Sequence, residues 1–336
     1  MNMRRLFPAL RFRLFPGLLT LLLLVSCGPR KKALLPNVSG KAGEVIIVID
    51  KSCWDGALGQ CLRDSLAADC PFLPQKEPLY TLSNVPPAAF SNIFQLHRNL
   101  ILCDIGPQVD KPSLKLGNDI WAAPQCVVRI NAPDEAAAVS LVRENMVHII
   151  NFIETAERNR VIDNTRRYQE ASIRPPVKAV FGGSPYFPSG YVLKKMTDNF
   201  AWIAYETTYV QQDILLYKVP AAGDASDFSL ETLVGHRNEV MKANVPGMFE
   251  NTYMTTSSFA VPSLRFVKYQ GRHFAELRGL WEVYNDFMGG PFVSHSFYSA
   301  DGASVITAEA FVYAPKYNKR HYLRQVESLL YSWDEQ

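Results

Sequence analysis

The sequence predicts an α+β protein: two α+β units with mainly antiparallel sheets and with helices packed on one face. Short runs of β-branched residues, such as residues 44–49, alternate with longer segments whose apolar residues recur at helical spacing. In the second half, strand-like runs follow one another across short turn sequences, which favours antiparallel pairing. The length of residues 27–336 suits one large domain or two medium-sized domains.

The first unit is expected over residues 43–175. After the strand at 44–49, a helix begins at Ser52 and places Trp54, Leu58, Leu62 and Leu66 on one face. Further strands are expected within 78–87, 99–106 and 125–130, with a short helix within 87–97. The strongest helix of the chain begins near residue 131 and extends to about residue 171. Its apolar period is set by Val139, Val142, Met146, Ile149 and Ile153.

The second unit is expected over residues 176–336. Helices are predicted from Ser229 to the sequence Asn-Val-Pro-Gly at 244–247, and over 317–333. Strands are predicted near 200–208, 212–219, 253–269, 272–284, 291–299 and 304–313. Residues 276–298 form a long hairpin in this interpretation, with its turn at 289–291 and with Leu277, Gly279, Trp281 and Val283 on one face.

The N-terminus combines a basic segment, an apolar segment and a cysteine. The apolar block at 14–25 is shorter than the about 20 residues that a bilayer span needs, and Pro16 and Gly17 interrupt it. Leu24-Val25-Ser26-Cys27 resembles a bacterial lipobox, in which the cysteine sulfur is acylated and the signal is cut just before it. We therefore predict a signal peptide at 1–26, lipidation of Cys27, and a flexible tether at 27–42.

The charge balance argues against nucleic acid as a partner. Residues 1–26 hold four of the 35 Lys and Arg and none of the 32 Asp and Glu, so 31 basic side chains remain against 32 acidic ones. A nearly neutral body lacks the dense positive face that nucleic-acid binding requires. Four basic residues, Lys316, Lys319, Arg320 and Arg324, are expected on the solvated outer face of the last helix.

Five cysteines follow Cys27, and an odd number leaves at least one thiol free. Cys61 with Cys70, and Cys103 with Cys126, remain open as disulfide pairs beside the alternative that all are small buried apolar residues. Two His/Glu pairs, His236 with Glu239 and His273 with Glu276, supply too few ligands for a metal site, and no metal or cofactor is expected.

No complete catalytic signature is found: the sequence lacks a G-x-S-x-G elbow, an H-E-x-x-H motif, a P-loop and a Rossmann glycine run. The most unusual stretch is the hairpin at 276–298. If it brings Arg278, Trp281, Asp286 and His295 together near its turn, these side chains line a pocket for an anion or carboxylate. A plain structural hairpin is the competing interpretation.

Five motifs resemble a family of exported lipoproteins of the Bacteroidota known as domain of unknown function 4837. They are TLSNVPPAAFSNIFQLHRNLIL, NAPDE, VPGMFENTYMTT, LRGLWEVYNDFMGGPFVSH and EAFVYAPKYNKRHYLRQVESLLY, and they extend over about residues 42–332. The resemblance implies a Gram-negative envelope lipoprotein and transfers no catalytic residue. Surface-exposed lipoproteins of this group often carry acidic residues after the lipidated cysteine, whereas this chain has Gly28-Pro29-Arg30-Lys31-Lys32, which favours the periplasmic side.

Two functional hypotheses follow. The first is a non-catalytic binding or assembly factor, held at the inner face of the outer membrane by the lipid on Cys27, with an envelope protein or glycan as partner. The second is an envelope hydrolase or transferase that acts on peptidoglycan, glycan or lipid, with its site near Arg278, Asp286 and His295.

Overall fold

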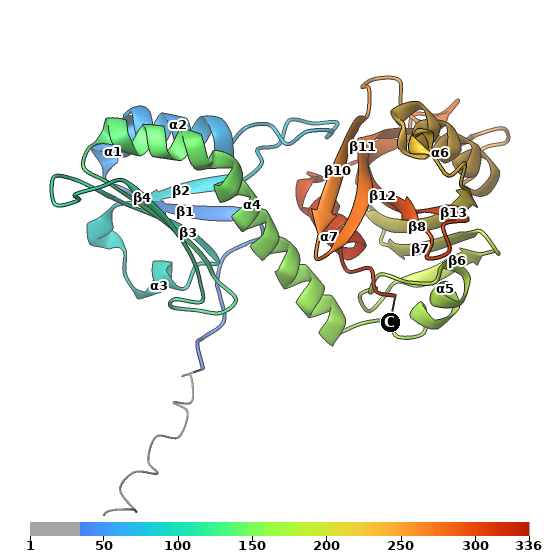
Figure 1. Cartoon of the computed structure of the whole chain (residues 1–336), viewed down its shortest axis with the longest axis horizontal. Helices are drawn as coiled ribbons and strands as arrows, with labels where there is room; N and C mark the ends of the chain where they lie inside the picture. The colour runs from blue at the N-terminus through green and yellow to red at the C-terminus, as the bar shows by residue number, and fades with distance from the viewer. Residues whose placement is uncertain (1–33, 336) are drawn as a thin grey trace, which may run out of the picture. The chain divides into compact units, whose positions relative to one another are not determined.

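The computed structural model describes residues 34–335 and arranges them around two β-sheets with helices (Figure 1), which confirms the α+β class. From Pro36 onwards the chain forms one compact unit. The predicted signal peptide and Cys27 lie outside the described residues. Among the residues that are described, no helix is both long and apolar enough to span a membrane.

The first sheet has the strand order β2-β1-β3-β5-β4. Its strands are β1 (Glu44–Val48), β2 (Thr81–Val85), β3 (Asn99–Ile105), β4 (Ser113–Asn118) and β5 (Cys126–Ala132). The prediction of mainly antiparallel pairing is wrong for this sheet, because β2, β1, β3 and β5 run parallel and only β4 pairs antiparallel. Helical crossovers between β1, β2 and β3 return the chain to the same end of the sheet, which parallel strands require.

Helices α1 (Lys51–Asp55) and α2 (Ala57–Leu66) cover one face of this sheet together with the first part of α4 (Figure 1). The opposite face packs against the segment of η2 (Pro87–Ala89) and α3 (Asn92–Gln95). The single helix expected from Ser52 is thus broken into two, because Gly56 has an extended backbone between them.

Helix α4 (Glu135–Arg167) has 33 residues and confirms the strongest sequence prediction. Its N-cap is Asp134, whose carboxylate accepts a hydrogen bond from the Ala137 amide at 2.8 Å. Val142 and Ile153 belong to the core of the first sheet, whereas Ile162 packs into the core of the second. One continuous helix therefore contributes to both cores.

The second sheet is antiparallel throughout, as predicted, with the order β10-β11-β12-β13-β8-β7-β6 and with β9 also paired to β11. Its strands are β6 (Val192–Met196), β7 (Phe200–Glu206), β8 (Gln211–Pro220), β9 (Tyr253–Thr256), β10 (Ser263–Tyr269), β11 (Arg272–Tyr284), β12 (Gly289–Tyr298) and β13 (Ser304–Tyr313).

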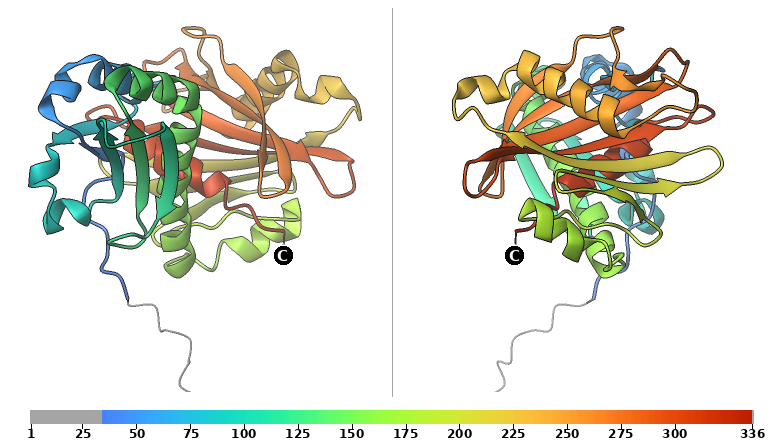
Figure 2. Two further views of the ribbon diagram at one scale, coloured as in Figure 1. Left: turned by 60° about the vertical axis from the view of Figure 1, so that its left-hand side comes forward. Right: turned by 90° about the vertical axis from the view of Figure 1, so that its right-hand side faces the viewer.

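Helices lie on both faces of the second sheet, which corrects the expectation of one covered face. Helices α5 (Arg174–Phe181) and α7 (Arg320–Leu330) pack on one face. Helix α6 (Leu230–Asn244), which follows η3 (Ala225–Phe228), packs on the other (Figure 2). Arg237 of α6 holds this second layer to β13, since its guanidinium donates to Glu309 at 2.8 and 2.9 Å with both side chains fully buried.

The first residues of α7 are held by a carboxylate from the first half of the chain. Glu77 is buried and accepts hydrogen bonds from the backbone amides of Lys319 at 2.6 Å and Arg320 at 3.1 Å. These amides belong to the helix N-terminus, where a negative charge is stabilising. Further along α7, Arg324 donates to Glu154 of α4 at 2.6 Å. The two halves are therefore joined by buried polar contacts as well as by α4.

Candidate functional site

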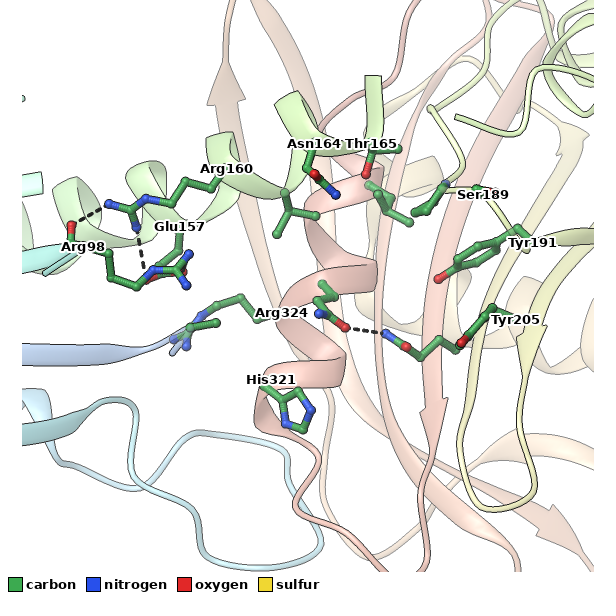
Figure 3. A pocket seen from close by; sticks show the side chains of 16 residues that line it. Arg98, Glu157, Arg160, Asn164, Thr165, Ser189, Tyr191, Tyr205, His321 and Arg324 are labelled. Atoms are coloured by element: carbon green, nitrogen blue, oxygen red, sulfur yellow. Dashed lines mark hydrogen bonds and ion pairs between the residues drawn. The ribbon is translucent and has the colours of Figure 1, made fainter. Parts of the chain in front are cut away.

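A groove of about 420 Å³ opens between α4, α7 and the strands β7 and β8 (Figure 3). Figure 3 shows Arg98, Arg160 and Glu157 gathered at one end and Tyr191 and Tyr205 at the other, with Arg324 between them. We call this hollow the arginine groove. Its lining residues include three arginines and one carboxylate, so its lining carries a net positive charge.

Glu157 is the only carboxylate among the lining residues, and it is 1% exposed. Arg98 Nη2 lies 3.1 Å from its Oε2, and Arg160 Nη1 lies 3.1 Å from its Oε1. The same carboxylate accepts hydrogen bonds from Asn99 Nδ2 at 2.7 Å and from the Gly43 amide at 3.3 Å. One buried negative charge therefore organises two arginines from two different elements.

Arg160 is held more firmly than Arg98. Its guanidinium donates to the carbonyl oxygens of Pro124 at 2.9 Å and Arg98 at 2.7 Å, and to Asn99 Oδ1 at 3.0 Å. Burial lowers the pKa of Arg160 from its ordinary value, while Glu157 acts in the opposite direction. By contrast, the buried Nε of Arg98 has no hydrogen-bond partner within residues 34–335.

Arg324 enters the groove from α7. Burial alone would lower its pKa, but the charge of Glu154 and the hydrogen bonds between the two side chains raise the pKa above its ordinary value. Arg324 Nη1 is buried without a hydrogen-bond partner in the part of the chain that the structure describes. Gly43, with a φ of +74°, allows this approach, since a Cβ at that position would lie 2.7 Å from Arg324 Nη1.

Polar and aromatic side chains form the other wall. Tyr191 and Tyr205 stack with ring centroids 5.7 Å apart, and Gln212 Nε2 donates to Gln325 Oε1 at 3.1 Å. His321 also lines the groove, and burial lowers the pKa of its imidazole, which favours the uncharged ring. The arrangement suits an anionic group held by guanidinium donors, beside a wall that accepts sugar-like or amide groups.

The residues predicted from the hairpin do not assemble into one pocket. Arg278 and His295 do meet, on either side of the buried carboxylate of Glu276. Arg278 Nε lies 2.7 Å from Glu276 Oε1, and His295 Nε2 lies 3.6 Å from Glu276 Oε2. Burial would raise the pKa of Glu276, but His295, Arg278 and Arg265 hold it well below its ordinary value, and burial lowers the pKa of His295.

Trp281 and Asp286 lie elsewhere. Trp281 is three residues from Arg278 on β11, and an odd spacing places two side chains on opposite faces of a strand. It packs against Phe311 and lines a separate hollow of about 250 Å³. Asp286 stands in the turn after β11, where its carboxylate accepts a hydrogen bond from the Phe287 amide at 2.7 Å. The alternative hydrolase or transferase site therefore lacks the geometry on which it depended.

The other site hypotheses have clear outcomes. Within residues 34–335, no group of three or more His, Cys, Asp and Glu side chains is placed to hold a metal ion. All five cysteines that the structure describes are free, so neither disulfide alternative is formed. The basic residues of the last helix do not all face solvent, because Lys319 and Arg324 are buried against the first half of the chain.

The groove residues were missed by sequence reasoning, although one signal was present. Ile149 and Ile153 continue at the same helical spacing to Glu157, so a carboxylate occupies the next position of an apolar row. A charge at such a position is rarely buried unless it is paired. Arg98 follows a short helix and has no comparable pattern around it.

Comparisons with known proteins add little about activity. The yeast (Saccharomyces cerevisiae) Ran-binding protein Mog1p is 9% identical, with 46% of this chain and 89% of that chain covered and a TM-score of 0.31. Human STARD10 is 9% identical, with 42% and 73% covered and a TM-score of 0.23. The lipid transfer and protein localization domain of human StarD13 is 14% identical, with 43% and 88% covered and a TM-score of 0.22. Likeness at these TM-scores carries no argument about function, and no curated protein matches the chain.

Two family models match successive parts of the chain. The resemblance to domain of unknown function 4837 is confirmed for the second half only, since the first half matches a different model. Residues 38–166 match the model of a domain of unknown function (DUF8532), and residues 170–332 match the model of a domain of unknown function (DUF4837).

Proposed function

We propose that this chain is a lipid-anchored envelope protein of the Bacteroidota and acts as a non-catalytic binding factor that holds an anionic ligand in the arginine groove. The lipobox around Cys27 supports the anchor, and the basic residues after it support an outer-membrane position facing the periplasm. An envelope glycan or protein that carries carboxylate or phosphate groups is the natural partner for such a groove.

The observation that carries the proposal is the excess of guanidinium groups over carboxylates among the groove residues. Arg98, Arg160 and Arg324 come from three segments far apart in the sequence, while Glu157 is the single lining carboxylate. Guanidinium groups present fixed pairs of N–H donors that match carboxylate and phosphate oxygens. Glu154, which lies outside the lining, pairs with Arg324. Three guanidinium groups are thus matched by two carboxylates, and an anionic ligand would compensate the one positive charge that remains.

Asn164 offers a direct test because it is exposed, lines the groove and lies on α4. Asn164→Asp adds one negative charge without a change of size. We expect about fivefold weaker binding of inorganic phosphate by calorimetry, since a charge near the bound anion costs about 1 kcal/mol at a protein surface. Asn151→Asp is the matched control: it makes the same change at an exposed position of the same helix, and phosphate affinity should stay unchanged. Equal affinities for both variants would contradict the proposal.

A further inference from the structure

The arginine groove continues into a second hollow of about 570 Å³. Arg98, Arg160 and Asn164 line both hollows. The second adds Arg167, an exposed residue at the end of α4, and one more carboxylate, Asp163. Across the two hollows the lining residues thus hold four arginines and two carboxylates.

The last part of the segment predicted as a tether, residues 36–40, forms a wall of this second hollow. Asn37, Val38 and Gly40 are among its lining residues. The segment is fixed to the body, since the Ala123 amide donates to the Pro36 carbonyl at 2.9 Å and the Arg98 amide donates to the Ser39 carbonyl at 3.1 Å. The positively charged hollow therefore lies at the point where the chain from Cys27 joins the folded body.

Chain length limits how far this point can be from the lipid. Pro36 is nine residues after Cys27, and nine residues span at most about 30 Å when fully extended. The stretch between them contains Arg30, Lys31 and Lys32. Basic residues next to a membrane anchor favour a surface rich in anionic lipids.

We propose that the groove binds the phosphodiester headgroup of an anionic lipid in the membrane that carries the anchor. This inference rests on the proposed function, because it names the ligand of the same groove. Arginine guanidinium groups pair well with phosphate oxygens, and the anchor makes lipid binding intramolecular. A soluble anion gains nothing from the short tether, whereas a headgroup is presented at high effective concentration.

The test uses the mature chain from Cys27 with Cys27→Ser, which removes the acylation site, and vesicles of phosphatidylcholine with or without phosphatidylglycerol. Co-sedimentation should depend on phosphatidylglycerol, and Asn164→Asp should weaken it at least about fivefold while Asn151→Asp does not. In a second pair, Arg167→Ser in the second hollow should weaken vesicle binding, whereas Arg143→Ser, at an exposed position of α4, should not. Both pairs are repeated with residues 30–32 changed to Ser, which separates the groove from the basic tether.

The outcomes separate the two proposals. If the binding of inorganic phosphate depends on Asn164 but vesicle binding does not, the groove binds anions and the proposal of a lipid headgroup as its ligand is wrong. If neither depends on Asn164 or Arg167 while the variants melt like the parent chain, both proposals fail. Free glycerol 3-phosphate is then added as a competitor of vesicle binding. If it competes and binds the chain with the same affinity whether or not vesicles are present, the site belongs to a soluble phosphate instead.

Discussion

Asp213 is a carboxyl group that is fully buried on β8. Trp202 Nε1 donates to its Oδ2 at 3.1 Å. Among the described residues, no cation lies at contact distance and its Oδ1 has no hydrogen-bond partner. Burial raises its pKa to about 7, although the hydrogen bond from Trp202 acts in the opposite direction. The folded protein therefore prefers the protonated acid over most of the acidic range.

This shift makes stability depend on pH. The folded pKa of about 7 lies above the ordinary value of 3.8, so the contribution of Asp213 is fully present below about pH 4 and is lost as the pH rises through about 7. Asp213→Asn keeps an acceptor for Trp202 and cannot ionise. We expect the variant to melt above the parent at pH 8, by a difference that becomes smaller at pH 5. A difference in melting temperature that does not change with pH would contradict this assignment.

Single residues also show where sequence reasoning stops. Alternation on β11 placed Leu277, Trp281 and Val283 on one buried face, and the structure confirms it. The same alternation places Arg278 and Trp281 on opposite faces of β11, so the predicted strand already contradicted the predicted pocket. Arg98 and Arg324 were beyond prediction as a pair, because 226 residues separate them and only the packing of α7 on α4 brings them to one groove.

At the scale of elements, helix α7 depends on a cap from outside its own segment. Glu77→Ala leaves the amides of Lys319 and Arg320 without their acceptor in a buried place. We expect a loss of about 2 kcal/mol in the free energy of unfolding, measured by denaturant titration, and a smaller loss for Glu77→Gln, which keeps one acceptor oxygen. Glu239→Ala, at an exposed position of α6, serves as the control and should change stability little. Equal effects at the two positions would show that the cap contributes nothing.

Most elements were predictable from periodicity, and their ends were not. Helix α4 and the strands β12 and β13 lie close to their expected ranges. The hairpin turn lies at 285–288 instead of 289–291, because Asn285 takes the left-handed conformation and Gly289 already pairs with Glu282. The expected strand at 253–269 is divided into β9 and β10, and Pro262 precedes the second part. Strand β6 and helix α5 are short and were not predicted, since their patterns depend on packing that a local window does not contain.

At the scale of the whole molecule, the proposed lipidation of Cys27 is the feature to test first. In the native envelope, mass spectrometry of the mature protein should find Cys27 as the first residue with its sulfur acylated, because only a thiol at that position accepts the diacylglyceryl group. Cys27→Ser should release the protein from membranes washed with high salt, which removes binding held by charge alone, whereas Cys53→Ser should leave it bound. A mature N-terminus at any other residue would refute the anchor.

Helix α4 sets the angular relation between the two halves of the chain. An α-helix turns about 100° and rises about 1.5 Å per residue, and α4 packs into one core through Ile153 and into the other through Ile162. One residue inserted between Ile153 and Glu157 would rotate the second set of contacts by more than a quarter turn and carry Arg160 away from Arg98. The number of residues between Ile153 and Ile162 is therefore fixed. Insertions and deletions are tolerated in the loops but not within this part of α4.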